Sequence, residues 1–180
     1  TATGTVIFEK NADERREVAS ITKLMTALLV LEALDRDEIA LTDSVQISPR
    51  AAAMKGSQAL LDASAVYPLE DLLRTTIMAS ANDSAVALSE YIAGSEENFV
   101  DRMNRRAAEL GMTNTNYVNC TGYPQSGQST TARDVCRLCC EIAKHPRYNQ
   151  YASVWIDKLI HPGGRVTDLT NTNRLVRFYE

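Results

Sequence analysis

One serine and one lysine in this sequence are spaced so that the lysine could activate the serine for covalent catalysis. Ser20 and Lys23 lie three positions apart in Ser20-Ile-Thr-Lys23, and residues i and i+3 of a helix share a face. A lysine accepts a proton only when neutral, so its pKa of about 10.4 must fall by roughly 3 units for activity near neutral pH. The apolar run after Lys23 and the positive end of a helix dipole both favour that shift. The same helix end would stabilise negative charge developing at Ser20.

A second group of polar residues follows sixty positions after Ser20, in Ser80-Ala81-Asn82. In an extended connector the side chains of Ser80 and Asn82 would point the same way. The hydroxyl could then relay a proton to a leaving group, and the amide could bind a substrate carbonyl. Alternatively, one of the two residues caps the helix predicted to follow, which is the commoner role for these residue types.

The histidines and cysteines of the chain do not suggest a competing catalytic or metal site. His145 and His161 each precede a proline, no G-x-S-x-G motif accompanies them, and both are predicted to lie at the surface. The chain has four cysteines. A cysteine-rich segment followed by His145 resembles part of a zinc site, but no second ligand pair accompanies it. We therefore predict no metal, and a helix over 132–144 whose buried stripe is Val135, Leu138, Cys139 and Ile142.

The overall composition is that of a globular enzyme-sized domain. The chain has 180 residues, of which 44% are hydrophobic and 23% charged, with a net charge of −4. Lysine and arginine are scattered along the chain, so we expect no nucleic-acid partner. The longest uncharged and largely apolar run, Leu24 to Leu31, is too short to span a bilayer, which needs about 20 residues. The opening residues contain no signal-peptide pattern.

The elements that must position these residues are predicted from periodicity and end signals. A helix from Ser20 to Leu34 is apolar on nearly every side and is therefore expected in the interior. The other predicted elements are a strand at Gly4–Lys10, helices at Pro68–Met78 and Asp83–Ala93, two helices capped by Ser95 and Thr131, and strands flanking Pro162-Gly163-Gly164. We divide the chain into an initial strand region (1–17), a mostly helical block (18–148) and a return toward a sheet (149–180).

Five segments together resemble the serine D-alanyl-D-alanine carboxypeptidases, which are low-molecular-weight penicillin-binding proteins of the serine β-lactamase and transpeptidase superfamily. The resemblance covers essentially the whole chain, and the matching segments are Val18–Ala27, Ala79–Leu88, Phe99–Gly111 with the Met-Thr-Asn-Thr that follows, Thr130–Asp134 and Asn171–Leu175. The resemblance implies an α/β (α+β) fold, β-lactamase/transpeptidase-like, in which a helical block packs on an antiparallel sheet. It also implies one partial catalytic domain.

By the same resemblance, Ser20 is the nucleophile, Lys23 the general base, Ser80 a proton relay and Asn82 a substrate ligand. The Ser20 backbone N–H would be one oxyanion-hole donor, and no metal or cofactor is implied. The substrate would be a peptidoglycan stem peptide ending in D-Ala-D-Ala, and β-lactam antibiotics would acylate Ser20. The parent protein would act outside the cytoplasmic membrane, often held there by a C-terminal anchor.

Two features depart from the family pattern. No lysine of this chain precedes Thr-Gly, so the family's Lys-Thr-Gly motif is missing; we expect the chain to stop just before the strand that carries it. That strand would supply the second oxyanion donor, whose loss costs about 10²–10³ in rate. The 180-residue chain is therefore predicted to be weakly active or inactive. The positions around Cys120 and Thr121 also look atypical.

Two other functions are compatible with the motifs. A serine β-lactamase of class A would need a deacylating glutamate on a loop between the second and third motifs. Here no glutamate lies between Glu109 and Glu141, both within predicted helices. A non-catalytic penicillin sensor or peptidoglycan-binding homologue would keep the fold without the activity.

Overall fold

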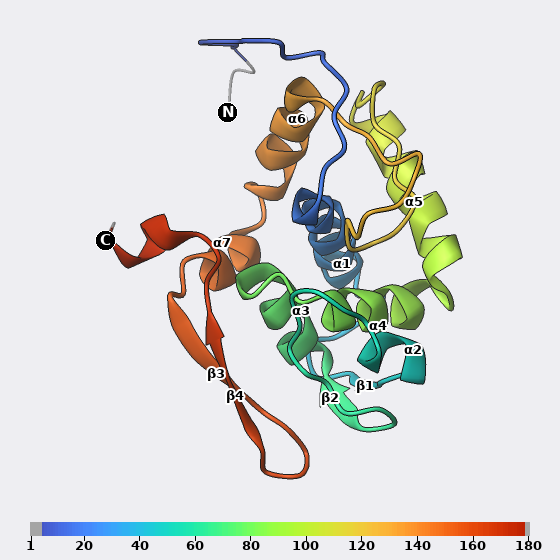
Figure 1. Ribbon diagram of the computed structural model, residues 1–180, viewed down its shortest axis with the longest axis vertical. Helices are drawn as coiled ribbons and strands as arrows, with labels where there is room; N and C mark the ends of the chain where they lie inside the picture. The colour runs from blue at the N-terminus through green and yellow to red at the C-terminus, as the bar shows by residue number, and fades with distance from the viewer. Residues whose placement is uncertain (1–4, 179–180) are drawn as a thin grey trace.

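A computed structural model describes residues 5–178 of the chain (Figure 1). Seven α-helices, two 3₁₀ turns and four short strands follow one another in this described part. In chain order they are η1 (Ser20–Thr22), α1 (Lys23–Asp35), β1 (Ser44–Gln46), α2 (Pro49–Ala52), β2 (Val66–Pro68), α3 (Leu69–Met78), α4 (Asn82–Ala93), α5 (Glu96–Glu109), α6 (Ala132–Ile142), α7 (Pro146–Ala152), β3 (Ile156–Ile160), β4 (Val166–Thr170) and η2 (Arg174–Arg177). None of these helices has the length and apolar character needed to cross a membrane.

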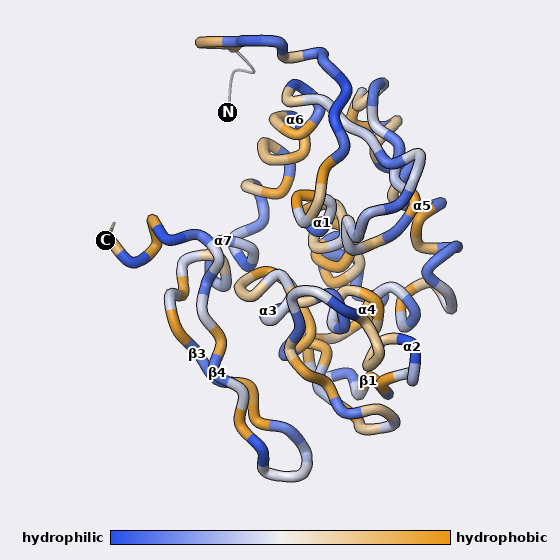
Figure 2. The backbone as a smooth tube through the Cα atoms, viewed as in Figure 1, coloured by the Kyte–Doolittle hydropathy of each residue, from blue (hydrophilic) through white to orange (hydrophobic). Residues whose placement is uncertain are grey.

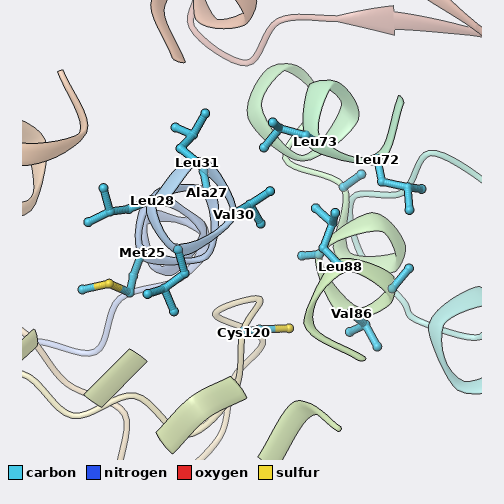
Figure 3. Packing of buried hydrophobic residues seen from close by; sticks show 14 of the residues in the cluster. Met25, Ala27, Leu28, Val30, Leu31, Leu72, Leu73, Val86, Leu88 and Cys120 are labelled. Atoms are coloured by element: carbon cyan, nitrogen blue, oxygen red, sulfur yellow. The ribbon is translucent and has the colours of Figure 1, made fainter. Parts of the chain in front are cut away.

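Helix α1 is the centre of the hydrophobic core. Its side chains are buried on nearly every side, as the apolar pattern predicts, and its tube is hydrophobic over most of its length (Figure 2). Helices α3, α4, α5, α6 and α7 all contact it. Figure 3 shows side chains projecting from α1 in several directions, with Leu73 of α3 and Leu88 of α4 on the side that faces it. Each fully buried leucine or methionine contributes about 1.5–3 kcal/mol, so this packing fixes where α1 begins.

Helix ends lie where the sequence signals predict them. The Ser95 hydroxyl accepts a hydrogen bond from the backbone N–H of Asn98 at 3.2 Å, which caps α5. The Thr131 hydroxyl does the same for Asp134 at the start of α6. Helix α4 ends at Gly94, whose φ of +78° is a left-handed conformation that glycine adopts without steric cost. These predictions are confirmed.

Two small antiparallel sheets accompany the helices. Strand β1 pairs with β2, and β3 pairs with β4 in a hairpin that runs from Ile156↔Thr170 at its base to Ile160↔Val166 near its tip. The hairpin, orange to red in Figure 1, lies beside α3. It turns through Pro162-Gly163-Gly164, as predicted. The predicted fold, helices with antiparallel strands, is therefore confirmed.

Three sequence predictions are wrong. Residues 5–10 form no strand, because within residues 5–178 no neighbouring strand pairs with them, and Ile7 is 98% exposed; Gly4 lies outside the described residues. The initial region 1–17 is thus not a strand region where it is described, apart from an isolated bridge between Arg16 and Thr130. Cys139 is exposed instead of buried, because the face of α6 that packs on the core carries Asp134, Leu138 and Ile142. His161 is buried instead of exposed.

The cysteines of α6 do not form a metal site. Across residues 5–178, no group of three cysteine, histidine or acidic side chains is arranged to hold a metal ion. Cys136, Cys139 and Cys140 are free thiols at or near the surface, and Cys120 is a free thiol in the core.

Candidate active site

Ser20 and Lys23 meet at the beginning of α1. Ser20 lies on the 3₁₀ turn η1 and is exposed, whereas Lys23 is the first residue of α1 and is only 4% exposed. The Lys23 Nζ lies 3.2 Å from the Ser20 Oγ and donates to the backbone carbonyl of Thr121 at 2.8 Å. A neutral amine in this position can donate one hydrogen to the carbonyl while its lone pair accepts the serine proton. The predicted contact between Ser20 and Lys23 is present.

Burial makes the lysine a usable base. Desolvation lowers the pKa of Lys23 from 10.5 to about 8, with Cys120 and Asp83 acting weakly in the opposite direction. Burial raises the pKa of the Cys120 thiol well above its usual value, so that thiol is uncharged at neutral pH and is no counterion for the amine. With a pKa of about 8, roughly a tenth of Lys23 is neutral at pH 7 and about half at pH 8.

The loop 119–123 holds the lysine in place. The Asn119 Oδ1 accepts hydrogen bonds from the backbone N–H groups of Thr121 (3.2 Å) and Gly122 (2.7 Å), which turns the Thr121 carbonyl toward Lys23. Gly122 has a φ of +78°, and a Cβ there would come within 1.9 Å of the Ala19 carbonyl oxygen. The loop therefore packs directly on Ala19, the residue that precedes Ser20, and only glycine fits at this contact.

Two further contacts fix this loop to the helical block. The Thr26 hydroxyl of α1 donates to the Cys120 carbonyl at 2.7 Å, and the Cys120 N–H donates to the Glu96 carboxylate at 2.9 Å. Glu96, at the start of α5, is itself paired with Arg50. The residues around Cys120 and Thr121 are atypical of the family, but the sequence does not predict this role. A main-chain carbonyl that accepts from a lysine leaves no residue-type signal.

Ser80 faces the same cavity as Ser20 and Lys23. The cavity has a volume of about 290 Å³ and is lined by Ser20, Ile21, Lys23, Leu24, Ala27, Thr76, Ile77, Ser80, Tyr148, Ala152, Asn171, Thr172 and Asn173. The sequence predicted an extended connector at Ser80, and this prediction is wrong. The φ of Ser80 is +55°, a left-handed conformation that costs a non-glycine residue roughly 1–2 kcal/mol. The Ser57 hydroxyl holds the preceding carbonyl, that of Ala79, at 2.7 Å.

Asn82 does not line this cavity. It is the first residue of α4, and its side-chain amide donates to the Lys55 carbonyl at 2.6 Å. The capping alternative is wrong as well, because the N-cap of α4 is Ala81 and no side chain caps the helix. The sequence motif therefore brings Ser80 to the cavity and leaves the Asn82 amide directed at the loop around Gly56.

The segment after β4 forms the wall opposite α1. The buried Asn171 donates from Nδ2 to the carbonyls of Ala152 (2.9 Å) and Val154 (2.8 Å), which fixes the base of the hairpin against α7. The Thr172 N–H donates to the carbonyl of Met78, the last residue of α3, at 3.0 Å. The sequence marked this segment through family resemblance only, since nothing in its residue types indicated a cavity wall.

The site combines an exposed hydroxyl, a buried amine of lowered pKa and a second hydroxyl around one half-apolar cavity. No acidic side chain or histidine is among the described residues that line it. Such a constellation suits nucleophilic acyl transfer through Ser20 with Lys23 as its base. Neither carboxylate-based hydrolysis nor a Ser-His-Asp relay has its parts within the lining.

Comparison with known proteins gives the same answer over the whole chain. The family model described as D-alanyl-D-alanine carboxypeptidase matches residues 1–180. The chain is 40% identical to the D-alanyl-D-alanine carboxypeptidase DacF of Bacillus subtilis, over 98% of this chain and 46% of that protein. It is 41% identical to DacC of Escherichia coli, over 76% of this chain and 36% of that protein.

A solved structure shares the fold. Penicillin-binding protein 5 from Haemophilus influenzae superposes with a TM-score of 0.90 at 30% identity, over 97% of this chain and 50% of that one. The chain thus spans about half, or less, of the length of these relatives.

Proposed function

This chain belongs to the D-alanyl-D-alanine carboxypeptidase family, and we propose that the protein carrying it removes the terminal D-alanine from peptidoglycan stem peptides through an acyl-enzyme on Ser20. The contact that carries the proposal is the 3.2 Å approach of the Lys23 amine to the Ser20 hydroxyl at the edge of a cavity. Proton abstraction explains a deeply buried lysine beside an exposed serine better than any structural role does.

In the proposed reaction, Ser20 Oγ attacks the carbonyl of the penultimate D-alanine while Lys23 Nζ takes the hydroxyl proton. The tetrahedral intermediate collapses when the C–N bond breaks and the amine of the terminal D-alanine leaves with a proton. Ser80, on the same cavity wall, is the proposed relay for that proton. Once Lys23 has given up the first proton to the leaving amine, water attacks the ester and Lys23 accepts the proton of that water. The bond between the acyl carbon and Ser20 Oγ then breaks, and Lys23 returns the proton to Oγ. The roles of Ser80 as proton relay and of Asn82 as substrate ligand are both proposals. For Asn82 the proposal requires that its amide exchange the Lys55 carbonyl for the substrate.

The same chemistry predicts reaction with β-lactams, which would acylate Ser20 as mimics of the D-Ala-D-Ala terminus. The substrate lies on the outer side of the bacterial cytoplasmic membrane, so we place the protein there as part of the proposal. The prediction that the 180 residues alone react weakly, because no Lys-Thr-Gly triplet occurs in them, stays a prediction.

The two alternative functions have no observation in their favour. A serine β-lactamase needs a base that rapidly deacylates the enzyme, and no carboxylate is found among the described residues around the cavity. A binding-only homologue has no need of a lysine held dry at a cost of several kcal/mol.

Release of D-alanine from a synthetic pentapeptide ending in D-Ala-D-Ala tests the proposal. In the protein that carries this chain, we expect Ser20→Ala and Lys23→Met to reduce release at least about 10³-fold, because nucleophile and base act as a unit. Ser153→Ala, an exposed hydroxyl after α7, is the matched control and should keep wild-type activity. Continued release by the Ser20→Ala variant would refute the assignment.

A further inference from the structure

A buried histidine fastens the tip of the β3–β4 hairpin to the rest of the molecule. His161 directly follows β3 and is 1% exposed. Its Nδ1 lies 2.7 Å from the Tyr67 hydroxyl and 3.1 Å from the Arg165 Nη2, and its Nε2 lies 2.8 Å from the Thr167 hydroxyl. Tyr67 belongs to β2, so these contacts join the hairpin to the other small sheet.

The contacts favour the neutral imidazole with its proton on Nε2. In that form Nδ1 accepts from the Tyr67 hydroxyl at 2.7 Å, and the Nε2–H donates to the Thr167 hydroxyl at 2.8 Å. The two hydrogens of Arg165 Nη2 go to the Leu60 carbonyl and the Asp62 carboxylate, so Arg165 faces Nδ1 as a positive charge. Protonation at Nδ1 would place a second positive charge about 3 Å from Arg165. Asp62 lies 3.6 Å from Nδ1 but is already paired with Arg165 at 2.8 Å.

The charged groups around His161 act in both directions, and the outcome is a weaker base. Burial first, and then Arg165, lower the pKa of His161, while Asp62 and, from α4, Asp83 oppose the shift. The imidazole is therefore neutral at pH 7, and acidification drives a charge into a buried contact that accommodates it poorly.

The tip of the hairpin is connected by hydrogen bonds to one wall of the cavity, and the base of the hairpin continues into another wall. Arg165 also donates to the Leu60 carbonyl at 2.6 Å. The flanking amides of Ala59 and Leu61 donate to Asp83, at 2.9 and 3.1 Å, and Asp83 follows the Ser80–Asn82 motif. At its base, the hairpin continues into Asn171–Asn173 on the cavity wall. The contacts of the hairpin tip thus connect the two polar walls of the cavity, which are the turn at Ser80 and the segment Asn171–Asn173.

We propose that His161 is a positioning residue: in its neutral form it pins the hairpin tip to the loop 60–67, and its protonation releases the tip and loosens the cavity walls. We call the contacts of His161 with Tyr67, Arg165 and Thr167 the latch. The proposal rests on the proposed function for its effect on rate, but the latch itself is testable without any activity. It makes the site sensitive to acidification in addition to the titration of Lys23.

The imidazole NMR signal of His161 and the fluorescence of Trp155 report on the latch directly. The chain has only two histidines and one tryptophan, so imidazole NMR signals can be assigned with a His145→Asn variant. Trp155 precedes β3, and its carbonyl accepts the Asn171 N–H at 2.9 Å. We expect His161 to titrate below about 6.5, together with a change in Trp155 fluorescence, over a pH range in which circular dichroism shows intact helices. Titration of His161 at or above 6.5, or an unchanged Trp155 signal, would overturn the latch.

In the protein that carries this chain, the pH dependence of penicillin acylation links the latch to the site. Below pH 8 the neutral fraction of Lys23 falls roughly tenfold per pH unit, which gives a slope of one in a logarithmic plot of rate against pH. The latch predicts a slope approaching two below the pKa of His161. His161→Asn, which keeps an acceptor near Nδ1 but cannot be protonated, should restore a slope of one. His145→Asn, the matched control, should keep the steeper limb.

A slope of one in the wild type throughout, despite NMR-detected protonation of His161, would show that the hairpin tip does not act on the site. Absence of acylation at every pH would instead count against the proposed function, and the NMR and fluorescence titrations would still decide whether the latch exists.

Discussion

At the scale of single residues, Lys23 sets function against stability. Lowering its pKa from 10.5 to about 8 corresponds to roughly 3 kcal/mol of unfavourable interaction for the ammonium form in the folded protein. The cost follows from enclosing the amine between α1 and the loop 119–123. Within residues 5–178, the Thr121 carbonyl is the backbone acceptor that the amine contacts.

The linkage between that pKa and folding is measurable. Because the folded-state pKa of Lys23 is depressed, the unfolded chain binds more protons between pH 8 and 10.5, so stability rises with pH across this window. In Lys23→Met the contribution is absent. We predict that the free energy of unfolding of the variant, relative to the wild type, falls by up to about 3 kcal/mol from pH 7.5 to 10.5. Urea denaturation of both proteins at the two pH values measures this; a pH-independent difference would contradict the lowered pKa.

Gly122 gives a second residue-scale prediction. Gly122→Ala forces a methyl group against the Ala19 carbonyl in a left-handed backbone and should destabilise the protein by about 3 kcal/mol or more. Gly111→Ala is the matched control: its φ of +70° is similar, but nothing lies within 4 Å, so only the conformational cost of about 1–2 kcal/mol applies. Thermal or urea unfolding compares the two. Equal losses would mean that the loop 119–123 does not pack on the residue before Ser20.

At the scale of elements, the start of α4 depends on a buried carboxylate. The Asp83 Oδ1 accepts from the Ala59 and Ser84 N–H groups, each at 2.9 Å, and Oδ2 accepts from the Leu61 N–H at 3.1 Å. The helix N-terminus adds a favourable field for the negative charge. Through these bonds one side chain aligns the loop 59–61 with the Ser80–Asn82 motif.

Asp83→Asn tests this anchor with almost no change in shape. Both carboxylate oxygens accept from N–H groups, so either orientation of an asparagine amide places an NH₂ against a donor. We predict a loss of about 2 kcal/mol in stability and slower penicillin acylation because Ser80 is no longer held. Glu38→Gln, an exposed carboxylate paired with Arg36, is the control and should change stability by less than about 1 kcal/mol. A neutral Asp83→Asn would show that the loop is held by other contacts.

Local sequence signals predicted the helices well and predicted long-range placement less well. The bounds of α1, α3, α4 and α5 follow to within three residues from apolar periodicity and from Ser95 and Gly94, since these signals act within one helical turn. The largest difference is at Ser20–Thr22, which form a 3₁₀ turn before α1. Residues 5–10 have β-forming side chains, but a strand also needs a partner, which local sequence does not supply. The burial of His161 comes from Tyr67 and Arg165, which meet it only in the folded hairpin.

At the scale of the whole molecule, the site exists because three distant segments converge on the start of α1, two of which line the cavity. The turn around Ser80 and the segment 171–173 join at the Thr172–Met78 hydrogen bond, and the loop 119–123 packs on the other side of Lys23. Figure 1 shows these segments gathered around the helical block. The fold shared with penicillin-binding protein 5, at a TM-score of 0.90, extends over 97% of this chain.

The sequence predicted only part of the candidate site, because residue types and spacing are local signals and the other features arise from tertiary packing. Ser20, Lys23 and Ser80 carry their chemistry in their residue types, so motif and spacing identified them. The Thr121 carbonyl, the left-handed Ser80 backbone and the hydrogen bond from Asn82 to Lys55 are products of tertiary packing. None of them leaves a pattern that spacing along the chain could disclose.

The central claim is that Ser20 is the nucleophile and that the neutral Lys23 amine activates it. Its most direct test is peptide mapping of the intact protein after reaction with benzylpenicillin. Cleavage after Arg16 and Lys23 yields the peptide Glu17–Lys23, in which Ser20 is the single serine. The account predicts one penicilloyl adduct, located on Ser20 and absent from Ser20→Ala. An adduct on any other residue, or one that persists in Ser20→Ala, would contradict it.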